Sequence, residues 1–133
     1  MWVPVPAAVA NPYRGAAEFR AALRRFLRRS EQCARQHGLT PRQHLLLLQI
    51  AGSDTGTATI SELVEKLALT QSGVTELVQR AESAGLVSRS SSPADGRVVE
   101  LSLTREGGRR LERVHNALGP ERHELRTIID DLG

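Results

Sequence analysis

Aromatic residues and long apolar runs are scarce in this sequence of 133 residues. Aromatics make up 3% of it, too few for the stacking platforms that bind single-stranded nucleic acids. No apolar run reaches the ~18 residues of a membrane-spanning helix, so we expect no membrane association. The N-terminus is apolar but lacks the basic region of a signal peptide. We therefore interpret residues 1–12 as an extended arm and expect a cytoplasmic protein.

Cysteine is limited to Cys33. A single cysteine excludes an internal disulfide and a cysteine-based zinc site, and it fits a reducing cytoplasm. His44, His115 and His123 are scattered rather than clustered as metal ligands. The sequence also lacks a glycine-rich phosphate loop and a nucleophile elbow. We therefore expect no metal, no cofactor and no enzymatic activity.

Lysine is almost absent, since Lys66 is the one lysine among 18 basic residues. The net charge is +3, with 40% hydrophobic and 25% charged residues, which is an ordinary soluble composition. This charge permits nucleic-acid binding without requiring it. The length fits one domain, or one domain with a helical extension.

Residues 59–104 carry the most information about function. They predict a short helix after Thr59, a tight turn, a second helix after Thr70 and then a two-stranded hairpin. Residues 98–103 alternate apolar and polar, as a half-buried strand does, and residues 90–96 have turn chemistry. A helix-turn-helix followed by such a hairpin, or wing, places its second helix in the major groove of DNA.

Helices are predicted on both sides of this segment. The first covers residues 13–36. The second starts at Thr40, where Gln43 completes a capping box, and its leucine-rich body predicts burial on most sides. Thr104 caps a fifth helix, residues 119–120 end it, and a last helix follows. The apolar stripes of the terminal helices need a further surface, and a second copy of the chain is the simplest candidate.

Three motifs follow one another along the chain. Residues 60–87 read ISELVEKLALTQSGVTELVQRAESAGLV, the wing carries Asp95-Gly96-Arg97, and residues 103–107 read Leu-Thr-Arg-Glu-Gly. In this order and spacing they resemble the third and fourth helices, the Asp-x-Arg wing and the Leu-Thr-x-x-Gly motif of MarR-type (multiple antibiotic resistance regulator) winged-helix transcription factors. The resemblance covers nearly the whole chain.

The resemblance implies a mainly α fold with a small β-hairpin wing, in a single domain over residues 1–133. Residues 1–38 and 104–133 would be dimerisation helices, and residues 40–103 the winged helix-turn-helix that binds DNA. It further implies a homodimer on a palindromic operator of double-stranded DNA. It implies a repressor that is released by a small-molecule effector or by oxidation. Any effector would bind between the DNA-reading unit and the dimerising helices.

The candidate contacts with DNA lie on the second helix of the helix-turn-helix and on the wing. Outward side chains of a recognition helix meet base edges, where glutamine pairs with adenine and arginine with guanine or phosphate. By resemblance, Arg97 enters the minor groove and Asp95 holds it. The candidates are Gln71, Ser72, Thr75, Glu76, Gln79, Arg80, Arg89, Asp95 and Arg97. The alternative is that Gln79, Arg80 and Arg97 are solvated surface residues and Asp95 only a turn residue.

The net charge of the predicted reading unit is unfavourable for binding DNA phosphates. Residues 59–103 hold four basic and six acidic side chains, a net −2, although phosphate neutralisation supplies much of the affinity for DNA. Family members often carry basic residues where Glu76, Gly96 and Ser90 stand. Residues 1–58, with eight arginines and three acids, are net +5, and Arg42 lies where it could approach the DNA backbone. We therefore expect modest binding that is steeply salt-dependent only if the first or second helix contributes.

The sequence is also compatible with two other functions. The acidic reading unit also fits a winged-helix module for protein contacts, or a regulator that binds DNA weakly without an effector. Cys33 and His37 are four residues apart, so an imidazolium could favour the thiolate of a redox sensor; a small buried residue is the alternative. His44 fits an effector pocket or a satisfied core histidine.

Overall fold

The computed structural model describes residues 2–3 and 11–132, so the predicted arm over residues 1–12 lies largely outside the described residues. The elements, in order, are α1 (Arg14–Gln36), α2 (Pro41–Ala51), β1 (Thr57–Thr59), α3 (Ile60–Leu67), α4 (Gln71–Ser83), β2 (Val87–Ser91), β3 (Val99–Leu103), α5 (Arg105–Ala117) and α6 (Gly119–Asp131). This is the predicted fold class, mainly helical with a small wing. No helix in the described part combines the length and apolar character needed to cross a membrane.

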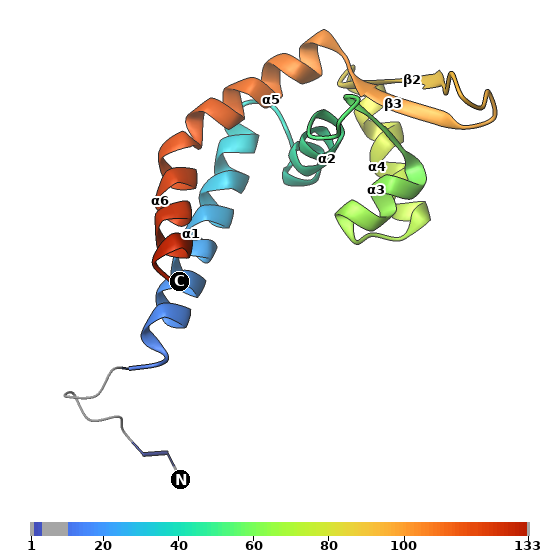
Figure 1. Ribbon diagram of the computed structural model, residues 1–133. Coiled ribbons are helices and arrows are strands. Elements are labelled where there is room, and N and C mark those ends of the chain that lie inside the picture. Colours follow the sequence, from blue (N-terminus) through green and yellow to red (C-terminus); the bar gives the residue numbers. More distant parts are fainter. Residues whose placement is uncertain (1, 4–10, 133) are drawn as a thin grey trace.

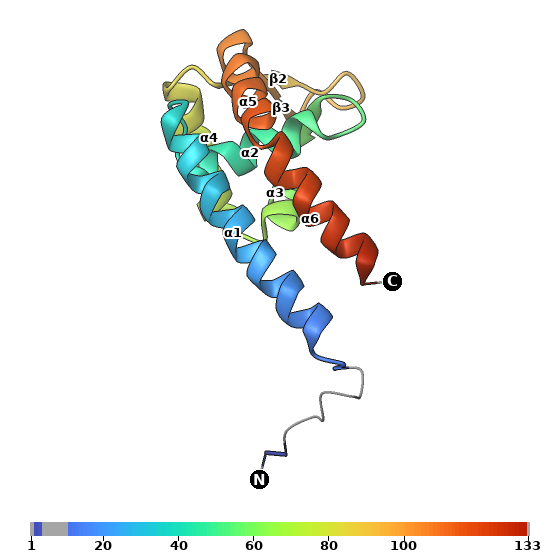
Figure 2. The ribbon, with the colours of Figure 1, turned by 90° about the vertical axis from the view of Figure 1, so that its left-hand side faces the viewer.

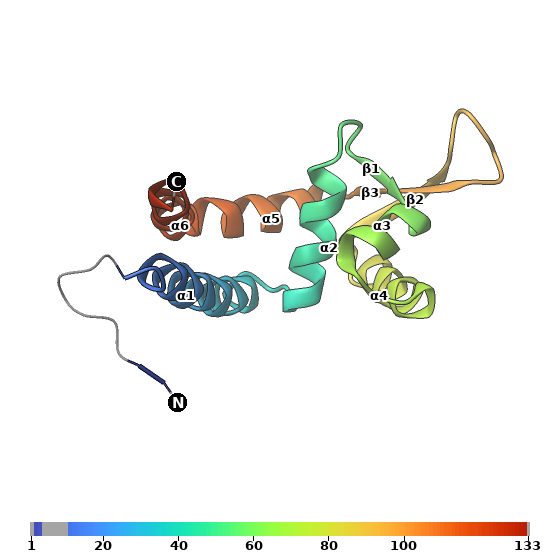
Figure 3. The same ribbon diagram turned by 60° about the horizontal axis from the view of Figure 1, so that its bottom comes forward.

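The molecule has two parts that α5 links. Helices α1 and α6 lie side by side as an arm, and the start of α1 and the end of α6 lie at the far end of it (Figures 1 and 2). The second part holds α3, α4 and the sheet, with the β2–β3 hairpin projecting as the wing. Helix α2 lies between the two parts (Figure 3) and contacts α1, α3, α4 and α5. The arrangement separates the predicted reading unit from the predicted dimerisation helices.

The sheet has three antiparallel strands in the order β1-β3-β2. The central Leu101 is buried and lies opposite Ala58 of β1 and Arg89 of β2. The residues predicted the hairpin of β2 and β3. Three residues are too few to show a period of two, so β1 has no signal of its own in the sequence.

Threonine caps set the starts of four helices. The hydroxyls of Thr40, Thr59, Thr70 and Thr104 each accept a hydrogen bond from the backbone N–H three residues later. The capping boxes predicted at Thr40 and Thr59 are both present. Such caps stabilise a helix by about 1 kcal/mol each. The predicted helix starts are confirmed, because the capping chemistry is local.

The core is one cluster shared by the end of α1, by α2, α3, α4, the sheet and α5. Its largest fully buried side chains are Leu46, Leu47, Ile50, Leu63, Leu86, Leu101, Val74, Val78, Val114 and Cys33. Helix α2 packs on most of its sides, as predicted, but one face stays open in the single chain, where Leu45 is 46% exposed and Leu48 39% exposed. All neighbours of α2 lie against its other faces, and the described residues leave this side uncovered.

Candidate nucleic-acid interface

Helix α4 presents a polar face opposite its packed face. Val74, Val78 and Ala81 are fully buried against the core, at the three- and four-residue spacing that defines one side of a helix. The other side carries six of the predicted DNA contacts. Gln71, Ser72, Glu76, Gln79 and Arg80 are exposed and Thr75 is half-buried. Burial of the apolar side therefore leaves the polar side chains free to meet a partner.

An ion pair joins two of these residues. The Nη2 of Arg80 lies 2.6 Å from Oε1 of Glu76, one helical turn away. Both side chains are mostly solvent-exposed, and such pairs stabilise a protein by less than about 1 kcal/mol. The contact neutralises the positive charge that α4 offers to DNA.

The wing holds Arg97 at its tip. The carboxylate of Asp95 accepts hydrogen bonds from the backbone N–H of Arg97 at 3.0 Å and from its Nε at 3.4 Å. The Arg97 side chain is nevertheless 93% exposed. The predicted pairing of the two residues is therefore present, with Asp95 shaping the turn and the guanidinium projecting outward.

Arg89, the predicted phosphate contact on β2, is engaged within the chain. Its guanidinium donates two hydrogen bonds to Glu82 at the end of α4. These bonds lower the pKa of Glu82 and raise that of Arg89. Each of the three basic candidates is thus paired with a carboxylate. Arg80 and Arg89 pair with Glu76 and Glu82 of α4, and Arg97 pairs with Asp95 of the wing.

The comparisons with known proteins agree on one family. The MarR family model matches residues 37–98. The uncharacterized HTH-type transcriptional regulator YsmB of Bacillus subtilis is 32% identical over 108 residues, which cover 78% of this chain and 73% of YsmB. This chain belongs to the MarR family.

A second sequence relative and a solved structure are also similar to this MarR-family chain, the structure in its fold. The transcriptional repressor MdtR of Bacillus subtilis is 34% identical over 79 residues, 59% of this chain. That match spans 50% of the length of MdtR. A mutant of E. coli MarR, solved in complex with operator DNA, has the same fold, with a TM-score of 0.66 and 24% identity over 83% of this chain and 78% of MarR.

Cys33 of this MarR-family chain is fully buried. Its Sγ lies 3.7 Å from Nδ1 of His37 and 3.9 Å from the carbonyl oxygen of Val114. The same Nδ1 is 2.9 Å from the carbonyl oxygen of Cys33, which can only accept a hydrogen bond, so Nδ1 carries the proton. The predicted proximity of the two side chains is confirmed. The burial of the thiol favours the packing role over redox sensing.

His44 lies on the packed side of α2 and is 6% exposed. Burial lowers its pKa below the ordinary value, so the neutral ring is favoured near pH 7. This environment favours the interpretation as a core histidine over the effector-pocket role. Among the described residues, no three His, Cys, Asp or Glu side chains are grouped to hold a metal ion.

A surface groove beside α4 was not predicted. It has a volume of about 400 Å³ and lies between the start of α2 and the second half of α4. Its lining residues are Thr40, Pro41, Arg42, Gln43, Leu77 and Arg80. Arg42 and Arg80 were predicted separately as possible DNA contacts, because nothing local shows that residues 40–43 and 77–80 meet.

Proposed function

We propose that this MarR-family chain is a sequence-specific transcriptional regulator that binds double-stranded operator DNA. The exposed polar face of α4, together with the projecting Arg97 of the wing, carries this proposal. A recognition helix with outward glutamines reads base edges in the major groove, and an outward arginine binds guanine or a backbone phosphate. An arginine on a narrow projection suits the minor groove.

We propose that the chain represses transcription and that it acts in the cytoplasm. Support comes from the relatives: MdtR is a transcriptional repressor and the MarR mutant was solved with operator DNA. The nine residues predicted to contact DNA remain the proposed site. A palindromic operator follows if two copies of the chain bind together.

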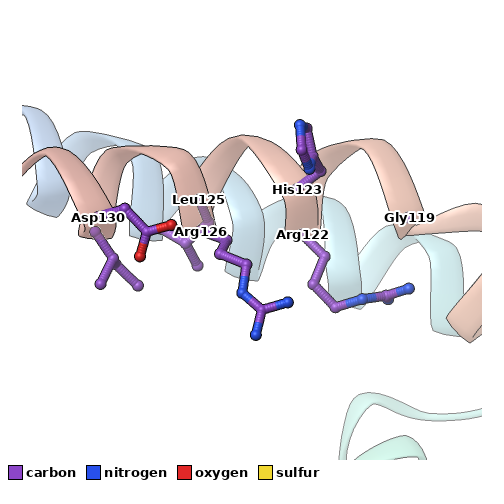
Figure 4. Close-up of a pocket in the computed structure, with 7 residues that line it drawn as sticks. Gly119, Arg122, His123, Leu125, Arg126 and Asp130 are labelled. Carbon is purple, nitrogen blue, oxygen red and sulfur yellow. The ribbon is translucent and has the colours of Figure 1, made fainter.

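A homodimer through α1 and α6 is part of the proposal. None of the described residues 119–131 of α6 is buried. Ile129 is apolar, yet 47% of it is exposed to solvent. Arg122, Arg126 and Ile129 help to line an open groove of about 540 Å³ along α6 (Figure 4). A helix with an apolar stripe and no buried residue needs a partner surface, which a second copy of the chain supplies.

The proposed small-molecule effector acts on the region around α2. This helix lies between the arm and the reading unit (Figure 3), and its exposed Leu45 and Leu48 offer an apolar surface. A ligand held there would favour one spacing of the two recognition helices over another. Effector binding is thereby coupled to DNA affinity.

Selection of random duplex DNA by the purified protein tests the proposed function. We expect an enriched palindrome whose affinity falls about tenfold or more with Arg97→Ala, while far-UV circular dichroism stays unchanged. No enrichment at low salt from a folded dimer would contradict it. That outcome would favour the module for protein contacts or a regulator that requires its effector.

A further inference from the structure

The groove between α2 and α4 brings two arginines together from distant parts of the sequence. Arg42 lies in the first turn of α2 and Arg80 in the second half of α4, and both line the groove. The start of α2 lies beside α4 in Figure 3, in agreement with the contacts between the two helices. Arg80 also belongs to the exposed polar face of α4. The groove therefore borders the surface proposed to read DNA.

Both arginines are available to an anion. Arg42 is exposed, and it forms no ion pair with any residue in the described ranges. Arg80 already binds an anionic group, because its Nη2 lies 2.6 Å from the carboxylate oxygen Oε1 of Glu76. A guanidinium fork binds carboxylate and phosphate with the same geometry. Glu76 thus occupies the position that a phosphate oxygen would take on Arg80.

The groove supplies positive charge that the acidic reading unit, residues 59–103, lacks. Residues 59–103 are net −2, and Arg89 is held by Glu82. Arg42 lies outside that segment and adds positive charge beside it. An exposed pair such as Glu76–Arg80 is weak, so a DNA phosphate can displace the carboxylate.

We propose that this groove is a backbone-phosphate subsite of the DNA interface, in which Arg42 and Arg80 bind one stretch of the strand and Glu76 competes with the phosphate for Arg80. The inference rests on the proposed DNA binding. Arg42 and Arg80 supply affinity without reading sequence. Glu76 lowers the affinity for every duplex alike, and so weakens nonspecific binding.

Titration of the full-length protein at several salt concentrations, on its selected duplex and on a scrambled one, tests the subsite. Arg42→Gln and Arg80→Gln should each weaken binding to both duplexes roughly fivefold and reduce the slope of log K against log salt by about 0.9. Arg113→Gln is the matched control, because Arg113 is an exposed arginine of α5. It should change neither quantity. Unchanged slopes for Arg42→Gln and Arg80→Gln would overturn the subsite.

Glu76→Gln tests the competition. It should tighten binding to both duplexes about twofold to threefold, in line with the energy of an exposed pair. The gain should vanish when Arg80→Gln is also present, because no guanidinium is left to release. An equal gain in both backgrounds would overturn the competition, as would a change in the preferred base at one position of the operator.

Failure of the subsite and failure of the proposed function give different results. A wild-type protein that binds no duplex contradicts the function itself. A wild-type protein that binds its operator and weakens with Arg97→Ala, but keeps its salt slope with Arg42→Gln and Arg80→Gln, contradicts the subsite alone. Thermal unfolding of each variant confirms that an exposed substitution leaves the fold intact.

Discussion

The guanidinium of Arg89 and the carboxylate of Glu82 form a two-pronged ion pair between β2 and α4. Nε of Arg89 donates to Oε2 at 2.9 Å and Nη2 donates to Oε1 at 2.5 Å. The pair ties the start of the wing to the end of the proposed recognition helix. It also engages the one basic side chain of β2, Arg89, which is one of the proposed DNA contacts.

Glu82→Gln should therefore release Arg89 and tighten DNA binding about twofold to fivefold. The loss in free energy of unfolding should stay below about 1 kcal/mol, because both side chains are partly exposed and solvent screens such pairs. Fluorescence anisotropy with labelled operator and urea unfolding measure the two effects. Glu65→Gln removes the same charge from an exposed position on α3. An equal gain with this control would show that only net charge matters.

Gly107 of α5 is predicted to tolerate alanine less well than its neighbour Gly108 does. A Cβ atom at this position would overlap the carbonyl oxygen of Leu86, whereas a Cβ at the neighbouring Gly108 would meet nothing within 4 Å. Gly107→Ala should lower the free energy of unfolding by about 1–3 kcal/mol through overpacking. Gly108→Ala should be neutral or stabilise the helix by up to about 1 kcal/mol. Urea unfolding of both variants checks this, and equal stabilities would contradict it.

Stability should depend on pH through His44. Burial lowers its pKa from 6.5, so the unfolded chain binds a proton at this residue more readily than the folded chain does. The stabilising contribution is present above about pH 6.5 and is lost as the pH falls through the folded pKa. The free energy of unfolding should decrease from about pH 7.5 to about pH 5.5 in wild type and less in His44→Gln. His123→Gln, at an exposed position, should keep the wild-type dependence, and a flat wild-type profile would contradict the prediction.

Ile129→Glu tests the proposed dimer surface. A carboxylate in an apolar interface is desolvated without a partner, so the dissociation constant of the homodimer should rise at least about tenfold. Analytical ultracentrifugation measures it. Thr127→Glu places the same charge at an exposed position on the same helix and should have little effect. Equal weakening by both substitutions would contradict a specific role of Ile129.

Much of the local structure was predictable from particular residues. Thr59 with Glu62 and Thr40 with Gln43 marked two helix starts through capping boxes that are present. The alternation along residues 98–103 located β3. The Leu-Thr-x-x-Gly motif was found by resemblance, and the structure gives the reason for its glycine in the close approach to Leu86.

Other features needed the folded chain. The apolar residues all round α2 did not show which of its faces stays open, and in the fold it is the face with Leu45 and Leu48, where no described element packs. Nothing in the sequence showed that Glu82 pairs with Arg89, the predicted phosphate contact. Seven residues separate the two, across the end of a helix and a turn, so no helical or strand spacing links them.

The sequence by itself determined the helices, the wing and the family, because capping, periodicity and turn chemistry act between neighbouring residues. Only the tertiary structure decided which charges meet. Ion pairs and grooves depend on side chains from different elements, such as Arg42 of α2 and Arg80 of α4. Local patterns predict which side chains face outward, whereas the packing of the elements determines which other side chains they contact.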